Sequence, residues 1–283
     1  MQTVSVNRRQ FLKTGAIATA LAATGRLPLL SAHTQAEPSV DELSGPHAVK
    51  PIRDHLKRFS PAEAPMRKSG QYSLVYDIIH WNWIAGKHGT FANSVLGRVA
   101  IERKASDNQV VYEIEQRMRI GGVDNYLEAR IICGTGDWNP LRSWTLRSHQ
   151  TAPGGGRDPL SELTEKGQCG DGRIRIESDN HEYGFSAKNP VVTQWTMLDF
   201  LMRKANPALN VTFDLLQDLS LFKPGQLLTY DGLTPVKLKE GNTVTLQTYA
   251  QTGQGVLPIH YLLDDLMRPQ LITGSLLSWA LAG

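Results

Sequence analysis

The feature that most constrains the fold is an alternation of apolar and polar residues that begins after Gly70. Over residues 110–120, apolar side chains occupy most of the alternate positions, and after Val111 the positions between them are glutamates and arginines. A period of two places successive side chains on opposite faces, so this pattern predicts a half-buried antiparallel strand. Runs of the same kind predict further strands at residues 71–78, 94–103, 125–132, 141–148 and 173–178.

One segment has a different period. Within residues 192–204, Trp195, Leu198 and Met202 fall at helical spacing, and residues 209–219 fit either a second short helix or a strand. The strands follow one another with no helical crossover, so we predict a mainly β chain whose antiparallel sheet carries one or two helices. The remaining predicted elements are strands at 227–230, 234–238, 242–252, 255–263 and 270–280, and a turn at 264–269.

The N-terminus carries a separate signal. Residues 8–13 read Arg-Arg-Gln-Phe-Leu-Lys, and a mildly apolar, alanine-rich run follows at residues 15–23. This order resembles a bacterial twin-arginine (Tat) export signal, with Asn7 as the departure from the usual pattern. The apolar run is too short and too weak to span a bilayer. The resemblance implies the Tat translocase as a partner during export and a periplasmic or secreted mature protein. We predict cleavage after Ala36, with residues 20–22 as a second candidate.

The chain therefore divides into a Tat signal peptide at residues 1–36, a polar arm or linker at 37–69 and a single β domain at 70–283. The arm contains five prolines, and its short segment 52–59 fits one or two helical turns. Four of the 30 basic residues and none of the 27 acidic residues lie in the signal peptide, which leaves 26 basic and 27 acidic residues. A nearly neutral mature chain argues against nucleic acid or an anionic membrane surface as the main partner.

Four further segments have a recognisable layout: residues 70–77, 99–103, 222–226 and 257–264. This layout resembles exported bacterial families of unknown function that are related in layout to the periplasmic lipoprotein carriers LolA and LolB. The resemblance implies a long, strongly curved antiparallel sheet, an open half-barrel, with its helix or helices packed on the concave face. In those carriers the enclosed space accepts acyl chains, and a curved sheet that does not close leaves such an apolar groove.

The leading interpretation is a periplasmic protein without enzymatic activity that binds an apolar or amphipathic ligand, such as a lipid or an acyl chain. The alternating strand faces and the apolar helix would line its groove. The predicted lining residues are Leu74, Tyr76, Tyr112, Ile114, Met118, Trp144, Trp195, Leu198 and Met202.

Two other interpretations stay open. One is an exported enzyme or cofactor protein with a site near His80 and His88, although these residues also fit a loop that caps the end of the sheet. The other is an envelope scaffold that binds another protein through an open sheet edge. The sequence contains no GxSxG or HExxH motif, so we predict no catalytic residue, metal or cofactor.

The cysteines are candidates for a disulfide, and some of the tryptophans are candidates for the rim of a groove. Cys133 and Cys169 are the only cysteines, 36 positions apart. An oxidising compartment favours a disulfide between them, whereas folding in the reducing cytoplasm before Tat export favours two free thiols. Three tryptophans near predicted turns are candidates for the rim of a groove: Trp81, Trp83 and Trp138.

Overall fold

A single large sheet dominates the structure, a computed structural model. Within the described residues, the sheet has 15 strands and is accompanied by one helix, α3. The strands lie in the order β8-β7-β6-β5-β4-β3-β2-β1-β15-β14-β13-β12-β11-β10-β9. The described residues are 70–80, 94–120, 122–151, 155–179, 181–237, 243–274 and 277–282.

The first eight strands form an uninterrupted antiparallel meander. A tight turn joins β6 and β7 at Asp171 and Gly172, whose positive φ angles of 50° and 70° suit a two-residue hairpin turn. The bounds of these strands are β1 Tyr72–His80, β2 Ser94–Ala105, β3 Val110–Ile120, β4 Val123–Cys133, β5 Leu141–Thr151, β6 Arg157–Gly170, β7 Arg173–Ser178 and β8 His181–Ser186.

The second half of the chain begins with β9, at the edge of the sheet opposite β8. The strand β9 pairs with β10 in parallel, and every other pairing is antiparallel. The helix α3, Gln194–Lys204, lies between β9 and β10 in the chain. The strand bounds are β9 Val191–Val192, β10 Asn210–Gln217, β11 Leu221–Lys237, β12 Thr243–Thr252, β13 Ile259–Leu263, β14 Pro269–Thr273 and β15 Leu277–Leu281.

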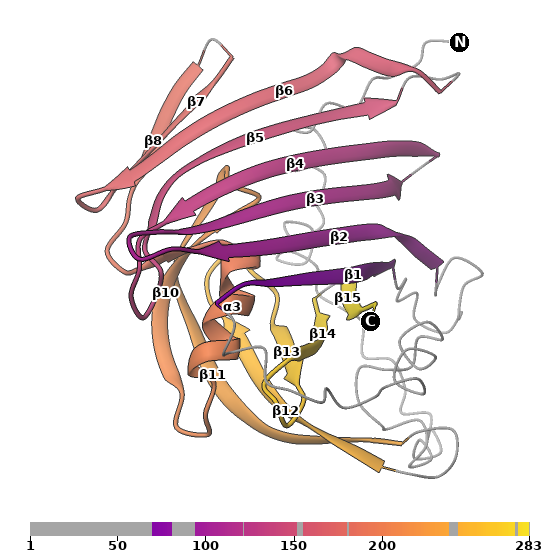
Figure 1. Cartoon of the computed structure of the whole chain (residues 1–283), viewed down its shortest axis with the longest axis vertical. Helices are drawn as coiled ribbons and strands as arrows, with labels where there is room; N and C mark the ends of the chain where they lie inside the picture. The colour runs from indigo at the N-terminus through magenta and orange to yellow at the C-terminus, as the bar shows by residue number, and fades with distance from the viewer. Residues whose placement is uncertain are drawn as a thin grey trace, which may run out of the picture.

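The sheet curls so that its two halves face each other with α3 between them at one end (Figure 1). Pairing of β1 with β15 joins the halves, and only residues 187–190 separate the two edge strands β8 and β9 in the chain. Those edges stay unpaired with each other, so the sheet is curved and open and is not a closed barrel. This confirms the predicted mainly β, curved, open sheet with a helix inside it.

Residues 209–219, which fit either a short helix or a strand, form strand β10. Other details differ from the sequence prediction. The single strand predicted at 270–280 is two strands, β14 and β15. The predicted strands at 227–230 and 234–238 are one strand, β11, because a bulge between Tyr230 and Gly232 bends it without ending it. The strands β6, β8 and β9 were not predicted, since β6 is mostly polar on both faces, β8 is short with four exposed residues, and β9 has two residues.

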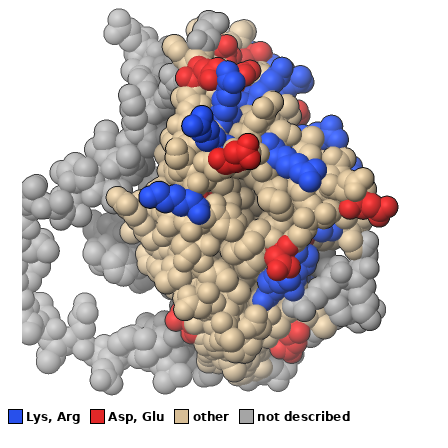
Figure 2. Space-filling view, turned by 90° about the vertical axis from the view of Figure 1, so that its left-hand side faces the viewer, with Lys and Arg blue, Asp and Glu red and all other residues tan. Residues whose placement is uncertain are grey.

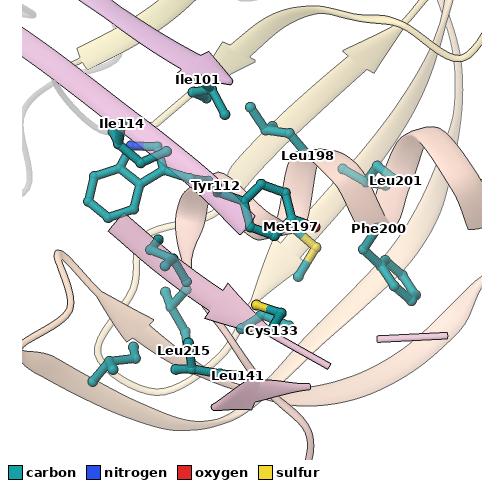
Figure 3. Packing of buried hydrophobic residues seen from close by; sticks show 14 of the residues in the cluster. Ile101, Tyr112, Ile114, Cys133, Leu141, Met197, Leu198, Phe200, Leu201 and Leu215 are labelled. Atoms are coloured by element: carbon teal, nitrogen blue, oxygen red, sulfur yellow. The ribbon is translucent and has the colours of Figure 1, made fainter. Parts of the chain in front are cut away.

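The core lies between α3 and the inner face of the sheet. A capping box starts the helix: Thr193 Oγ1 accepts from Thr196 N at 3.1 Å, and Thr196 Oγ1 accepts from Thr193 N at 2.9 Å. All residues from Trp195 to Met202 are buried. Figure 3 shows Met197, Leu198 and Leu201 packed among the inward side chains of the sheet. Within the described residues, no helix has the length and apolar character needed to cross a membrane.

Candidate functional site

Six of the nine predicted lining residues lie on the inner face of the sheet, and Trp195, Leu198 and Met202 belong to α3. Eight of the nine are at most 3% exposed and belong to the apolar cluster between the sheet and α3, so side chains of the helix fill the space that the strand residues border. The ninth, Met118, is partly buried at the margin of that cluster. The eight buried residues are Leu74, Tyr76, Tyr112, Ile114, Trp144, Trp195, Leu198 and Met202.

Beyond α3, the same inner face continues and is partly exposed. In β3 the inward residues change from buried at Ile114 to intermediate at Met118, and in β4 they change from buried at Ala129 to intermediate at Leu127. Strand register connects these positions across the sheet, because Leu127 pairs with Ser148 and Ser148 pairs with Leu163. We call this region the open inner face and define it as Gln116, Met118, Asn125, Leu127, Ser148, Gln150 and Leu163.

The open inner face has a polar end. Gln150 Nε2 donates to Asn125 Oδ1 at 2.8 Å, and Asn125 Nδ2 donates to the carbonyls of Met118 at 3.3 Å and Val123 at 3.2 Å. These bonds fix the orientation of both amides next to the apolar side chains of Met118 and Leu127. The surface therefore presents apolar contact area and uncharged hydrogen-bonding groups side by side.

A buried carboxylate fixes the helix that bounds this surface. Asp199 of α3 is 1% exposed. Its oxygens accept from Tyr112 Oη at 2.9 Å, Asn139 Nδ2 at 2.8 Å, Arg203 Nε at 2.7 Å and Tyr72 Oη at 3.2 Å.

A second guanidinium approaches the same carboxylate. Arg103 Nε lies 2.7 Å from Asp199 Oδ1 as a contact between opposite charges, without the direction of a hydrogen bond, and Arg103 Nη1 donates to the Gly70 carbonyl. The partners of Asp199 therefore come from β1, β2, β3, α3 itself and the loop after β4.

The loop after β4 is fixed to α3 by further contacts. Arg203 donates to the carbonyls of Gly136 at 3.3 Å and Asp137 at 3.1 Å, and the ring of Trp138 stacks on Phe200 with centroids 4.0 Å apart. Asn139 adopts a left-handed φ of 43°, which brings its amide to Tyr112 and Asp199. Trp138, predicted at a rim, therefore packs against the helix.

The electrostatics of the cluster keep its hydroxyl groups protonated. Burial and the negative charge of Asp199 raise the pKa of Tyr72 and of Tyr112 well above the ordinary tyrosine value. Both phenols thus remain donors to the carboxylate over the physiological range. With two guanidinium groups, two phenols and an amide around it, the carboxylate is suited to holding α3 in place. The sequence signal for this cluster was the lone acidic residue in an apolar helix, which the periodicity argument did not use.

Cys133 and Cys169 are free thiols, and the predicted disulfide is not supported. Cys133 ends β4 and Cys169 lies in β6, with β5 between the two strands. Two strand spacings place such residues about 9–10 Å apart, beyond the ~7 Å limit between Cα atoms that a disulfide allows. The alternative of two free thiols holds in the structure.

The two thiols are expected to differ in reactivity. Burial and the nearby Asp199 raise the pKa of Cys133 to about 12, and burial also raises the pKa of Cys169, which is less enclosed. Since only the thiolate reacts, iodoacetamide should label Cys169 of the folded protein first at about pH 8. Peptide mass spectrometry measures the two rates. Equal labelling rates of Cys133 and Cys169 in the folded protein would contradict this prediction. In guanidinium, where the protein is unfolded, the two labelling rates should be equal.

Two of the hollows formed by described residues lie on the outer face. The larger, about 460 Å³, is lined by Asp77, Arg98, Arg117 and Asp124 over an apolar floor, and its charges are paired as Arg98–Asp77 at 2.7 Å and Arg117–Asp124 at 3.0 Å. The smaller, about 280 Å³, includes Trp144 and a mixture of charged residues of both signs. Figure 2 likewise shows Lys and Arg interspersed with Asp and Glu over the face that it presents, with no extended patch of one sign there.

Several predicted residues cannot be placed. Trp81, Trp83 and His88 lie outside the described residues, and for His80 only the backbone is described. The arm at 37–69 and the cleavage site after Ala36 also lie outside them. In the part of the chain that the structure describes, no group of three or more His, Cys, Asp or Glu side chains is arranged to hold a metal ion.

Comparison with known proteins identifies the N-terminus. The family described as the TAT (twin-arginine translocation) pathway signal sequence matches residues 5–25. The chain carries a Tat export signal. It is therefore exported across the cytoplasmic membrane, to the periplasm or beyond, and meets the Tat translocase on the way.

The rest of the chain has weak counterparts. No curated protein matches the chain by sequence. Among solved structures, a DUF1089 family protein from Pseudomonas aeruginosa is similar at a TM-score of 0.37, with 12% identity over 67% of this chain and 95% of that chain. A likeness of this strength carries no argument about fold or function.

Proposed function

We propose that this Tat-exported protein is a non-enzymatic binding protein that holds an amphipathic ligand, of the class of lipids or acyl chains, on its open inner face. One observation carries the proposal: the apolar lining of the sheet continues past α3 and is partly exposed there, at Met118, Leu127 and Leu163. The layout that resembles LolA and LolB belongs to the same proposal, and the open curved sheet is consistent with it.

The chemistry of the surface favours a chain with a polar group at one end. Each methylene buried against Met118, Leu127 or Leu163 contributes about 0.8 kcal/mol, so a long acyl chain gains much more than a small solute. The amides of Asn125 and Gln150 offer donors and acceptors without charge. An ester or hydroxyl group fits this end better than a bare carboxylate, which would lack a cationic partner there.

Native mass spectrometry of the mature protein, purified after export by its own host, tests the proposal. A bound lipid that leaves on mild denaturation is the expected result. Leu127→Gln should remove the adduct, because it places an amide in the apolar row, and Leu163→Gln on β6 provides an independent variant of the same row. Glu128→Gln is the matched control, since it neighbours Leu127 but faces outward and is exposed.

The same measurements define the results that would contradict lipid binding on the open inner face. If wild-type protein carries no lipid, or if the adduct persists in folded Leu127→Gln and Leu163→Gln proteins, the ligand does not bind on the open inner face. Circular dichroism confirms that each variant is folded before its mass is interpreted.

The open edge of the sheet favours a second candidate function, that of an envelope scaffold. Within the described residues, β8 pairs only with β7, and four of its six residues are exposed. An unpaired edge can accept a strand from another protein. Co-purification of one stoichiometric partner, lost when Glu182 on β8 is replaced by proline, would favour this function over lipid binding.

A further inference from the structure

The last strands of the sheet are buried on both faces. In β13, the successive residues Tyr261, Leu262 and Leu263 are each no more than 2% exposed. Successive residues of a strand point to opposite faces, so something covers each face of β13. In β3, by contrast, the buried Ile114 is followed by the exposed Glu115, as expected for a sheet with one face in water.

Two separate sets of buried side chains account for this difference. Tyr261 and Leu263 belong to the apolar cluster around α3. Leu262 belongs to a second set that is buried but lies outside that cluster, and strand register aligns it with Leu271 and Ala280. We call this second set the second apolar face: Ile79, Leu246, Ala250, Leu262, Leu271 and Ala280, none more than 9% exposed.

Polar residues of the same rows are buried with it. Thr248 pairs with Leu262, and Thr273 pairs with Ser278, which in turn pairs with Ile79; these three polar residues are at most 5% exposed. A sheet buries a face only against another layer. Among the described residues, α3 packs in the other cluster and the remaining elements are strands of the sheet itself.

We propose that residues 52–59 of the N-terminal arm form the layer that covers the second apolar face. Ile52, Leu56 and Phe59 recur at intervals of four and three, which places all three on one side of a helix. The positions between them are charged or polar: Asp54, Lys57 and Arg58 fall on the opposite side, and Arg53 and His55 flank the stripe. An apolar stripe about 10 Å long matches the width of three neighbouring strands, which is also about 10 Å.

Residues 60–69, which connect the segment 52–59 to β1, are long enough for the segment to reach the second apolar face. Ten residues, 60–69, lie between the segment and Gly70, where the described chain begins just before β1. Ten extended residues reach about 33–36 Å, whereas the stretch of β1 from Tyr72 to Ile79 is about 24 Å long. Pro61 and Pro65 favour the extended state of this connection. The segment can therefore lie over β13–β15 while the chain enters β1 from its other end.

Site-specific photo-cross-linking of the full mature protein tests the assignment. Leu56→benzoylphenylalanine should form cross-links within one chain to peptides of β12–β15, identified by mass spectrometry. Lys57→benzoylphenylalanine, on the opposite side of the predicted helix, is the matched control and should not cross-link to Leu262 or Leu271.

A second measurement uses milder changes. In Leu56→Gln, hydrogen exchange at the amides of β13 and β14 should accelerate at least about tenfold, and binding of an apolar dye should increase. Lys57→Gln should leave both unchanged.

The assignment is overturned if Leu56→benzoylphenylalanine cross-links to a second copy, to another protein or to residues 81–93 in place of β12–β15. Unchanged exchange in Leu56→Gln overturns it as well. Neither result bears on the lipid proposal, because that surface lies on the inner face of β3–β6.

Discussion

Replacing Asp199 with asparagine is expected to lower the free energy of unfolding by about 3–5 kcal/mol, the range for removing one partner of a buried ion pair. The amide would leave the Arg103 guanidinium, whose side chain is 9% exposed, without a compensating charge. It would also direct an NH₂ group toward donors, since Arg203, Tyr112 and Asn139 all donate to the carboxylate. Urea denaturation of the mature protein, followed by circular dichroism, measures the change.

Asp137→Asn provides the matched control for this variant. Asp137 also pairs with a basic residue of α3, Lys204 at 2.5 Å, but its side chain is 79% exposed. Solvent screens such a pair, so the denaturation midpoint should hardly move. If Asp199→Asn is no less stable than Asp137→Asn, the buried network does not hold α3 in place.

Gly167→Ala is expected to destabilise the fold by about 3 kcal/mol, at the upper end of the range for overpacking a core. A Cβ atom at this position in β6 would lie 2.0 Å from Cζ2 and 2.2 Å from Cε2 of Trp144. Trp144 is 2% exposed and belongs to the apolar cluster, so its indole ring has no free space to enter. Thermal unfolding and the tryptophan emission spectrum report the effect.

Two further variants sharpen this prediction. Gly170→Ala lies in the same strand with nothing within 4 Å of the added Cβ, so it should leave stability almost unchanged. Trp144→Phe combined with Gly167→Ala should recover part of the loss, because the smaller ring leaves room for the methyl group. A Gly167→Ala protein as stable as Gly170→Ala would show that the ring moves freely.

The strand pattern illustrates what periodicity can predict. In β3 the inward and outward residues follow the alternation of the sequence, and the predicted bounds, 110–120, match the structure. The prediction missed β6, because the residues around Pro159 are polar on both faces of that strand and show no alternation. Strand β12 was predicted at 242–252, close to its observed bounds, although the neighbouring residues Tyr249 and Ala250 are both buried.

The candidate site was less predictable than the strands. The strand residues expected to line a groove do face inward, but five of them are buried in the cluster with α3, and Met118 lies at its margin. The other three expected residues belong to α3 itself. The partly exposed surface lies instead around Leu127 and Leu163, which the sequence analysis had placed on no site. A pattern of period two reports which side of a strand a residue faces, and it carries no information about how far a helix extends over that side.

The sequence alone determined the export route, the mainly β architecture and the face of most strands, because each depends on residues that are neighbours in the chain. The tertiary structure decided the rest. Only the curled sheet brings Tyr72, Arg103, Tyr112 and Asn139 to Asp199, and only the strand order separates Cys133 from Cys169 by an intervening strand. Such contacts join residues up to 127 positions apart. They depend on packing between distant segments, which local spacing does not encode.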